Sequence, residues 1–193
     1  MAEDDTLDLH AVDMQGAHAE ITAQLMYQMT NLGFLALANI PGYDEEALFG
    51  HQKWFFALSP EVKERLYKNH FRPANKNLYR GLAPFIDNDP SHKELYEVGL
   101  DWAQVSDDEK RYPLHEETPW PEGAEAFKSF MLKHYDVMHK LGMKVMSHIA
   151  EGLGQPAGYF DKWFARDTCS TFRIIHYLPR SVDVVKQDKL SAD

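Results

Sequence analysis

Hydrophobic residues recur at helical spacing in two well-separated parts of the chain. A set with spacings of four, four and three predicts an amphipathic helix, and Gly33 follows where a C-terminal cap belongs. The members of this set are Ile21, Leu25, Met29 and Leu32. A second set predicts the longest helix, over residues 124–153, with one apolar face that packs against a sheet or other helices. Its members are Phe127, Met131, His134, Met138, Leu141, Val145 and His148.

Shorter elements lie between these helices. Acidic residues in a first turn predict a helix over residues 44–57, and Ser59-Pro60-Glu61 is typical of a helix start. Residues 34–39 predict a short buried strand, and the partial alternation after Lys93 predicts another. Residues 106–118 are charged and predict a surface loop.

Alternation with a period of two marks the stretch Ser170–Arg180 as a strand that Pro179 ends. One face carries Phe172, Ile174 and His176, and the other carries Arg173, Ile175 and Tyr177. A cation and a phenol on one face suit a pocket wall, because together they can bind a carboxylate. The alternative is a surface cation beside a half-buried tyrosine on an edge strand. We expect His176, on the more apolar face, to be a core histidine.

The segment of residues 70–90 is rich in proline, asparagine and glycine, which predicts a long irregular loop. Loops of this length within compact domains are usually functional or disordered, and the aromatic and basic side chains here favour a functional loop. Arg80 lies between Tyr79 and Gly81, where a glycine permits a close approach of the backbone to a ligand. Arg80 is therefore a candidate anion contact, although the pattern is unspecific.

Composition narrows the class of protein. The 193 residues suffice for one domain, and the net charge of −10 argues against a nucleic-acid partner and against an anionic membrane surface. The longest apolar run is too short to span a bilayer and the first residues are acidic, so we expect a cytoplasmic protein. The single cysteine, Cys169, excludes an internal disulfide, and we expect a buried or inert thiol.

The ten histidines do not predict a metal site from their spacing. His134 and Asp136 form a His-x-Asp pair, but two residues along a helix differ by about 200° in direction and cannot share one ion. We expect His134 and His148 to be hydrogen-bonded histidines on an apolar helix face, and Asp136 to lie in solvent.

Several short motifs follow one another in a recognisable order. They are Leu32–Ile40, Phe55–Lys63, Tyr79–Pro84, Lys93–Gly99 and Phe172–Pro179. These segments resemble the "GFF-x-V-x-NHGI", "FF-x-LP-x-EEK", "RGY", "KE-x-F-x-x-G" and "LR-x-x-x-YPP" motifs of the isopenicillin N synthase-like 2-oxoglutarate/iron(II) dioxygenases. Departures occur: Leu178 stands in place of the first proline of the last motif, and Asn39 is followed directly by Ile40.

The resemblance implies an α+β fold in which a helical N-terminal region leads into the first strands of a double-stranded β-helix, or jelly roll. The implied divisions are residues 1–15 as a flexible acidic lead-in, 16–165 as the mainly helical region and 166–193 as the start of the jelly roll. It also implies that Tyr177 is a cosubstrate- or substrate-side residue and that Arg80 contacts a substrate carboxylate. Together with the strand and loop patterns, this makes Tyr177 and Arg173 the candidates for the cosubstrate and Arg80 and Tyr79 the candidates for the substrate.

The complete enzyme of this family would use iron(II) and 2-oxoglutarate to hydroxylate, desaturate or cyclise a small molecule. The family's His-x-Asp, distal His and Arg-x-Ser follow the "YPP" strand, and nothing after Asp183 matches them. We therefore expect a truncated amino-terminal part that is inactive alone and binds neither iron nor cosubstrate. The alternative is a non-catalytic binding module derived from the family. The substrate and oligomeric state stay open.

Overall fold

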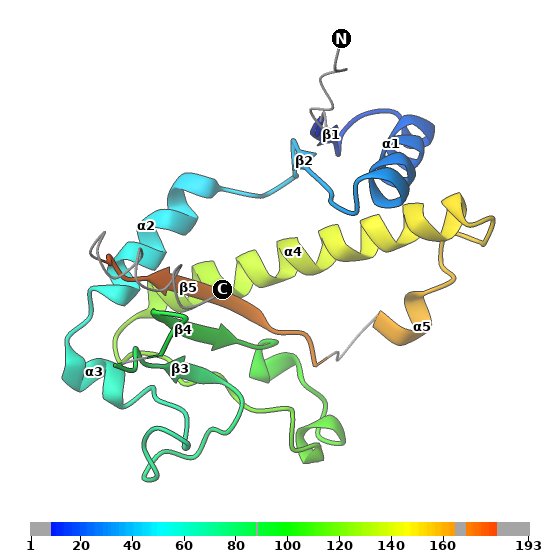
Figure 1. Cartoon of the computed structure of the whole chain (residues 1–193). Coiled ribbons are helices and arrows are strands. Elements are labelled where there is room, and N and C mark those ends of the chain that lie inside the picture. The colour runs from blue at the N-terminus through cyan, green and yellow to red at the C-terminus, as the bar shows by residue number, and fades with distance from the viewer. Residues whose placement is uncertain (1–8, 88, 165–168, 181–193) are drawn as a thin grey trace. The chain divides into compact units, whose positions relative to one another are not determined.

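The computed structural model describes residues 9–87, 89–164 and 169–180 of the chain. The chain divides into two compact units, each built from two separate segments. The first unit comprises Met1–Leu48 and Ala126–Cys169, and the second comprises Phe49–Glu125 and Ser170–Asp193. Together their described parts form a mixed helix and sheet fold (Figure 1).

Two helices and a two-stranded sheet form the core of the first unit. Helix α1 spans His18–Asn31, and α4, the longest helix in Figure 1, spans Glu125–Gly152. Strands β1 (Val12–Asp13) and β2 (Leu37–Ala38) pair in parallel. The short helix α5 spans Asp161–Phe164. The buried core consists of Val12, Met14, Ile21 and Leu25, and the half-buried Leu141 and Val145 of α4 pack against it.

The two long helices confirm the apolar patterns, with one exception on α1. Met29 is exposed, whereas Gln28 is buried. The Gln28 side-chain amide donates to the carbonyl oxygen of His10, and its oxygen accepts from the Ala36 N–H at 3.1 Å. These bonds satisfy backbone groups on both flanking segments, so a polar residue faces inward here. Gly33, with φ of 73°, confirms the predicted cap.

The second unit is organised around a three-stranded antiparallel sheet of order β3-β4-β5. Its strands are β3 (Gly81–Ala83), β4 (Lys93–Val98) and β5 (Phe172–Tyr177). Helix α3 (Pro60–Glu64) belongs to this unit, as does most of α2 (Glu45–Phe56). A single 3₁₀ turn at Trp102–Gln104 precedes the charged segment of residues 106–118, and another at Glu109–Arg111 lies within it.

One face of this sheet is buried and the other is open. Leu82, Tyr96 and Ile174 are fully buried, and the Phe55 ring lies 4.3 Å from the Tyr96 ring between centroids. The Tyr96 hydroxyl donates to the carbonyl oxygen of Pro119 at 2.7 Å. Along β5 the burial alternates as predicted, with Ile174 inside and Arg173 outside.

Three predictions need correction. Residues 34–39 form only the two-residue β2, which is half-buried and not a buried strand. The irregular segment 70–90 contains a strand, β3, at its centre. Cys169 is exposed, which excludes the buried alternative of its prediction.

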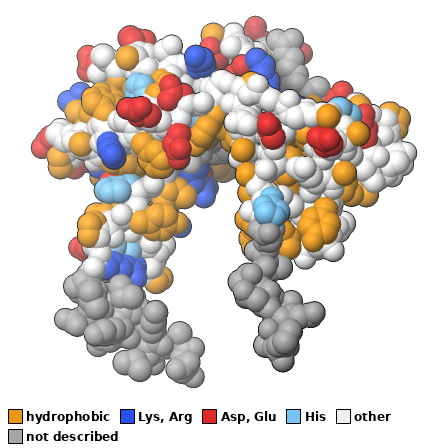
Figure 2. All heavy atoms as spheres, turned by 90° about the horizontal axis from the view of Figure 1, so that it is seen from above, with side chains coloured by type: hydrophobic (Ala, Val, Ile, Leu, Met, Phe, Trp, Pro, Cys, Tyr) orange, Lys and Arg blue, Asp and Glu red, His pale blue; other side chains and the backbone are white. Residues whose placement is uncertain are grey.

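Charged and hydrophobic side chains are interspersed on the face that Figure 2 shows. Among the helices that the structure describes, none is long and apolar enough to cross a membrane.

Candidate functional site

The open face of the β3-β4-β5 sheet carries a cluster of charges centred on Glu97. Lys68 and Arg173 both donate to the Glu97 carboxylate, Arg173 through Nε at 2.9 Å and also through its Nη2. The Glu97 side chain is only 7% exposed, whereas that of Arg173 is 49% exposed. Burial alone raises the pKa of Glu97, but the hydrogen bonds and charges of Lys68 and Arg173 outweigh it and hold the pKa below its usual value. Glu97 is therefore ionised at neutral pH.

The alternation along β5 places Arg173 and Tyr177 on this face, and the register with β4 determines their neighbours. Arg173 lies opposite Glu97, and Tyr177 lies opposite Lys93. The Lys93 ammonium lies 5.9 Å from the centroid of the Tyr177 ring. Residue Tyr177 is 65% exposed. The structure thus brings both predicted cosubstrate residues to one accessible surface, and the Arg173 guanidinium already contacts an internal carboxylate.

A second cluster of charges, around Glu94, lies at one end of the buried face of the β3-β4-β5 sheet. Lys63 donates to both Glu94 oxygens at 3.0 and 3.1 Å, and the His176 Nδ1 lies 3.0 Å from Oε1. The His176 side chain is 43% exposed and stacks near Phe56, with ring centroids 5.1 Å apart. The prediction of a core histidine is therefore wrong, because the strand leaves the core at its C-terminal end.

Tyr79 and Arg80 are held by a carboxylate from a distant loop. Glu116 accepts from the backbone N–H groups of Leu78, Tyr79 and Arg80 at 2.8, 2.8 and 3.0 Å. The buried Arg80 guanidinium donates to the Thr171 hydroxyl and to the Ser170 carbonyl oxygen, the latter at 3.3 Å. Arg80 therefore ties the loop to the start of β5, while the Tyr79 side chain is exposed.

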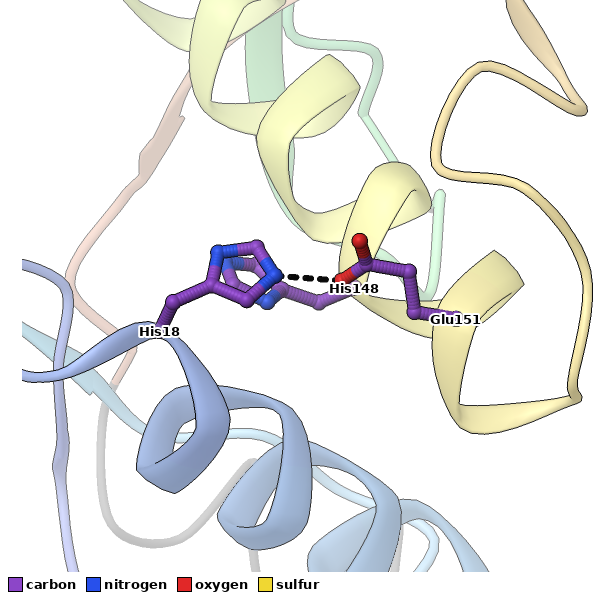
Figure 3. Close-up of side chains that lie close together, drawn as sticks. All are labelled: His18, His148 and Glu151. Carbon is purple, nitrogen blue, oxygen red and sulfur yellow. Dashed lines mark hydrogen bonds and ion pairs between the residues drawn. The ribbon is translucent and has the colours of Figure 1, made fainter.

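A group of three metal-ligating side chains lies between α1 and α4 in the first unit (Figure 3). His18 comes from α1, and His148 and Glu151 come from α4; one donor atom of each lies within 4.8 Å of the other two. The His18 Nε2 contacts the Glu151 Oε2, and the rings of the two histidines are 4.4 Å apart between centroids. Burial is the main cause that lowers the pKa of His148, and the nearby His18 and Lys144 lower it further. This ring is therefore neutral at neutral pH.

Sequence reasoning missed this group because its partners lie on two helices. His148 and Glu151 are three positions apart on α4, which was a usable signal, but nothing in the sequence places His18 beside them. The expectation of a hydrogen-bonded, buried His148 is confirmed. His134 is buried beside Phe130, and burial lowers its pKa, whereas Asp136 is exposed and pairs with Lys140 at 2.6 Å.

Comparison with known proteins identifies relatives along most of the chain. No family model matches the sequence. Hyoscyamine 6-dioxygenase of Hyoscyamus niger is 28% identical over 170 residues, which are 80% of this chain and 45% of that protein. The full-length Neurospora crassa protein solved with alpha-KG (2-oxoglutarate) and 5-formyluracil shares 26% identity at a TM-score of 0.71, over 96% of this chain and 57% of that one.

A third similarity concerns the fold alone. A 2OG-Fe(II) oxygenase family protein from Caulobacter crescentus has a TM-score of 0.69 at 24% identity, over 89% of this chain and 57% of that one. The chain thus spans about half the length of the proteins that it matches. These similarities support the 2-oxoglutarate/iron(II) dioxygenase family for this chain.

The described residues of the sheet do not fit the iron that this family implies. A mononuclear iron(II) site of this kind needs two histidines and a carboxylate that converge. Glu94 and His176 meet on the sheet, yet in the described part of the chain the one group of three such ligands is that of His18, His148 and Glu151. We therefore assign no step through iron to the residues of the sheet.

Proposed function

We propose that the protein acts as an iron(II)- and 2-oxoglutarate-dependent dioxygenase that hydroxylates, desaturates or cyclises a small molecule. The observation that carries this proposal is the similarity to a dioxygenase over 80% of the chain, together with the similarity over 96% of the chain to a structure that contains alpha-KG. In this proposal the chain supplies the helical region and the first strands around the site.

Arg173 and Tyr177 are the residues that we propose for the cosubstrate. Two cations, Lys68 and Arg173, surround one ionised carboxylate, Glu97, so the cluster carries a net charge of about +1, which attracts a dicarboxylate. The Arg173 side chain, which is 49% exposed, and the phenol of Tyr177 offer donors on the same face. Glu97 holds Arg173 in place, so less side-chain entropy is lost when a ligand binds.

Tyr79 and Arg80 are the residues that we propose for the substrate side, with different roles. The Tyr79 ring is exposed and can contact a small molecule, while its backbone N–H donates to Glu116. The buried Arg80 guanidinium holds Ser170 and Thr171, and therefore positions the entry into β5. Substrate contact by Arg80 stays a prediction.

The test is calorimetric binding of 2-oxoglutarate to the product of the whole reading frame that contains this chain, with manganese(II) as a redox-inert substitute for iron. We expect binding that requires the metal. Arg173→Ala should weaken it about tenfold or more, because a charge-assisted hydrogen bond contributes about 1.5–3 kcal/mol. Glu122→Gln, a change at a side chain that is 93% exposed, is the matched control and should bind normally.

Two results separate the parts of the proposal. Absence of metal-dependent 2-oxoglutarate binding in the folded wild-type protein would refute the function. Normal binding by Arg173→Ala would refute the role of Arg173 and leave the function standing.

A further inference from the structure

We propose that His18, His148 and Glu151 form a binding site for one zinc(II) ion between α1 and α4. Two imidazoles and one carboxylate are a donor set that zinc sites in proteins use, with water in the fourth position. All three donors belong to the first unit, and they come from helices whose apolar faces pack together through the core around Ile21 and Leu25.

The surroundings of His148 orient the ring for an ion. Its Nδ1 lies 2.8 Å from the Thr22 hydroxyl, and that hydroxyl donates its own proton to the His18 carbonyl oxygen at 3.1 Å. The Thr22 oxygen therefore accepts from Nδ1–H, which leaves Nε2 unprotonated and able to bind a metal. A hydrogen bond from the non-ligating ring nitrogen to a neighbouring oxygen is the usual support of a metal-bound histidine.

The other two donors are able to move into place. The His18 side chain is 63% exposed and that of Glu151 is 33% exposed, so rotation about their side-chain bonds meets little packing resistance. In the present arrangement His18 Nε2 contacts Glu151 Oε2 directly. An ion held at about 2.0–2.2 Å from each donor would replace this contact and separate the two atoms by about 3.3 Å. His148 is fully buried and supplies the fixed point of the site.

Zinc is the ion that this donor set favours. Three protein ligands of nitrogen and oxygen suit a four-coordinate ion, whereas calcium and magnesium prefer six or more oxygen ligands. Zinc also binds nitrogen-donor sites more tightly than manganese or iron(II) does, so it competes well with these two ions. A bound ion would join α1 to α4 at one end of their packed region.

The test is equilibrium dialysis of the tag-free chain against zinc(II), with absorption spectroscopy of its cobalt(II) form. We expect about one zinc per chain and cobalt bands of a low-symmetry, four- or five-coordinate site. His18→Ala and Glu151→Gln each should lower the zinc affinity about tenfold or more and remove these bands, since each deletes one of three ligands. His139→Ala, which changes another histidine of α4, is the matched control and should bind zinc as the wild type does.

Circular dichroism of each variant without metal checks that the helices remain folded. His18 and Glu151 are chosen because their side chains are exposed or partly exposed, and the buried His148 is left unchanged. Zinc should also raise the unfolding temperature of the wild type and of His139→Ala, and leave that of the two ligand variants unchanged. Absence of zinc binding by the wild type, or equal zinc affinity in the wild type and both folded ligand variants, would overturn the proposal. Neither outcome depends on 2-oxoglutarate, so it leaves the proposed function untouched.

Discussion

Replacement of Glu97 by glutamine should destabilise the second unit by removing the charge that Lys68 and Arg173 share. The Lys68 side chain is 16% exposed, so the variant leaves a largely buried ammonium facing a neutral amide. Loss of one partner from a buried ion pair costs about 3–5 kcal/mol. The amide oxygen still accepts a hydrogen bond and Arg173 is half exposed, so we expect a loss of about 2–4 kcal/mol in the free energy of unfolding.

The measurement is urea unfolding of the wild type and variants, monitored by circular dichroism. Arg173→Ala should cost only about 1 kcal/mol or less, because Lys68 continues to neutralise Glu97. Glu122→Gln alters a carboxylate that is 93% exposed and pairs only with the exposed Arg65 at 3.7 Å in the described part of the chain, so it should stay within about 0.5 kcal/mol of the wild type. A Glu97→Gln loss no larger than that of Glu122→Gln would refute the reasoning.

The pH dependence gives the same reasoning a second test. Because the pKa of folded Glu97 lies below its usual value of 4.5, its ionised form stabilises the fold above that pH. This contribution is lost as the pH falls from about 4.5 through the lower, folded-state pKa. The stability difference between the wild type and Glu97→Gln should therefore be largest above about pH 5 and shrink in acid. A difference that stays constant down to pH 3 would contradict the assigned role.

Two further substitutions test how the loop before β3 is held. Gly81→Ala, at the first residue of β3, should lower the free energy of unfolding in urea by about 2–4 kcal/mol, because the φ of Gly81 is +114° and a Cβ would lie 2.5 Å from the Leu66 carbonyl oxygen. The control Gly142→Ala adds a Cβ in open space on α4 and should be neutral or stabilising. Equal effects of the two substitutions would contradict this account. Glu116→Ala should speed hydrogen exchange at the amides of residues 78–80 about tenfold or more, because it removes the acceptor of these three N–H groups. The control Glu117→Ala should leave this exchange unchanged. Unchanged exchange in Glu116→Ala would show that Glu116 does not hold this loop.

Elements set by local periodicity could be predicted from the sequence. The seam of α4 and the alternation along β5 depend on the side chains of one segment, and both were found. Met29 fits the apolar spacing of α1, yet Gln28 is buried because it satisfies backbone groups of His10 and Ala36. Such a bond joins segments that are apart in sequence, and spacing along one helix carries no information about it.

The candidate sites show the same limit. The two cations that hold Glu97 come from a loop and from β5, 29 and 76 positions away. The alternation of β5 predicts that Arg173 and Tyr177 share a face, but only the strand register reveals that Glu97 occupies the guanidinium. His18 and Glu151 are 133 positions apart, so their meeting depends on the packing of two helices.

Product formation is the most direct test of the proposed 2-oxoglutarate-dependent oxygenase activity. The product of the whole reading frame would be incubated with iron(II), 2-oxoglutarate and oxygen, with and without a panel of small molecules, and succinate would be quantified. We predict succinate formation that requires iron(II) and is stimulated by a substrate of the panel, with oxidised substrate formed in an equal amount. Oxidation of a panel member without consumption of 2-oxoglutarate would contradict the account.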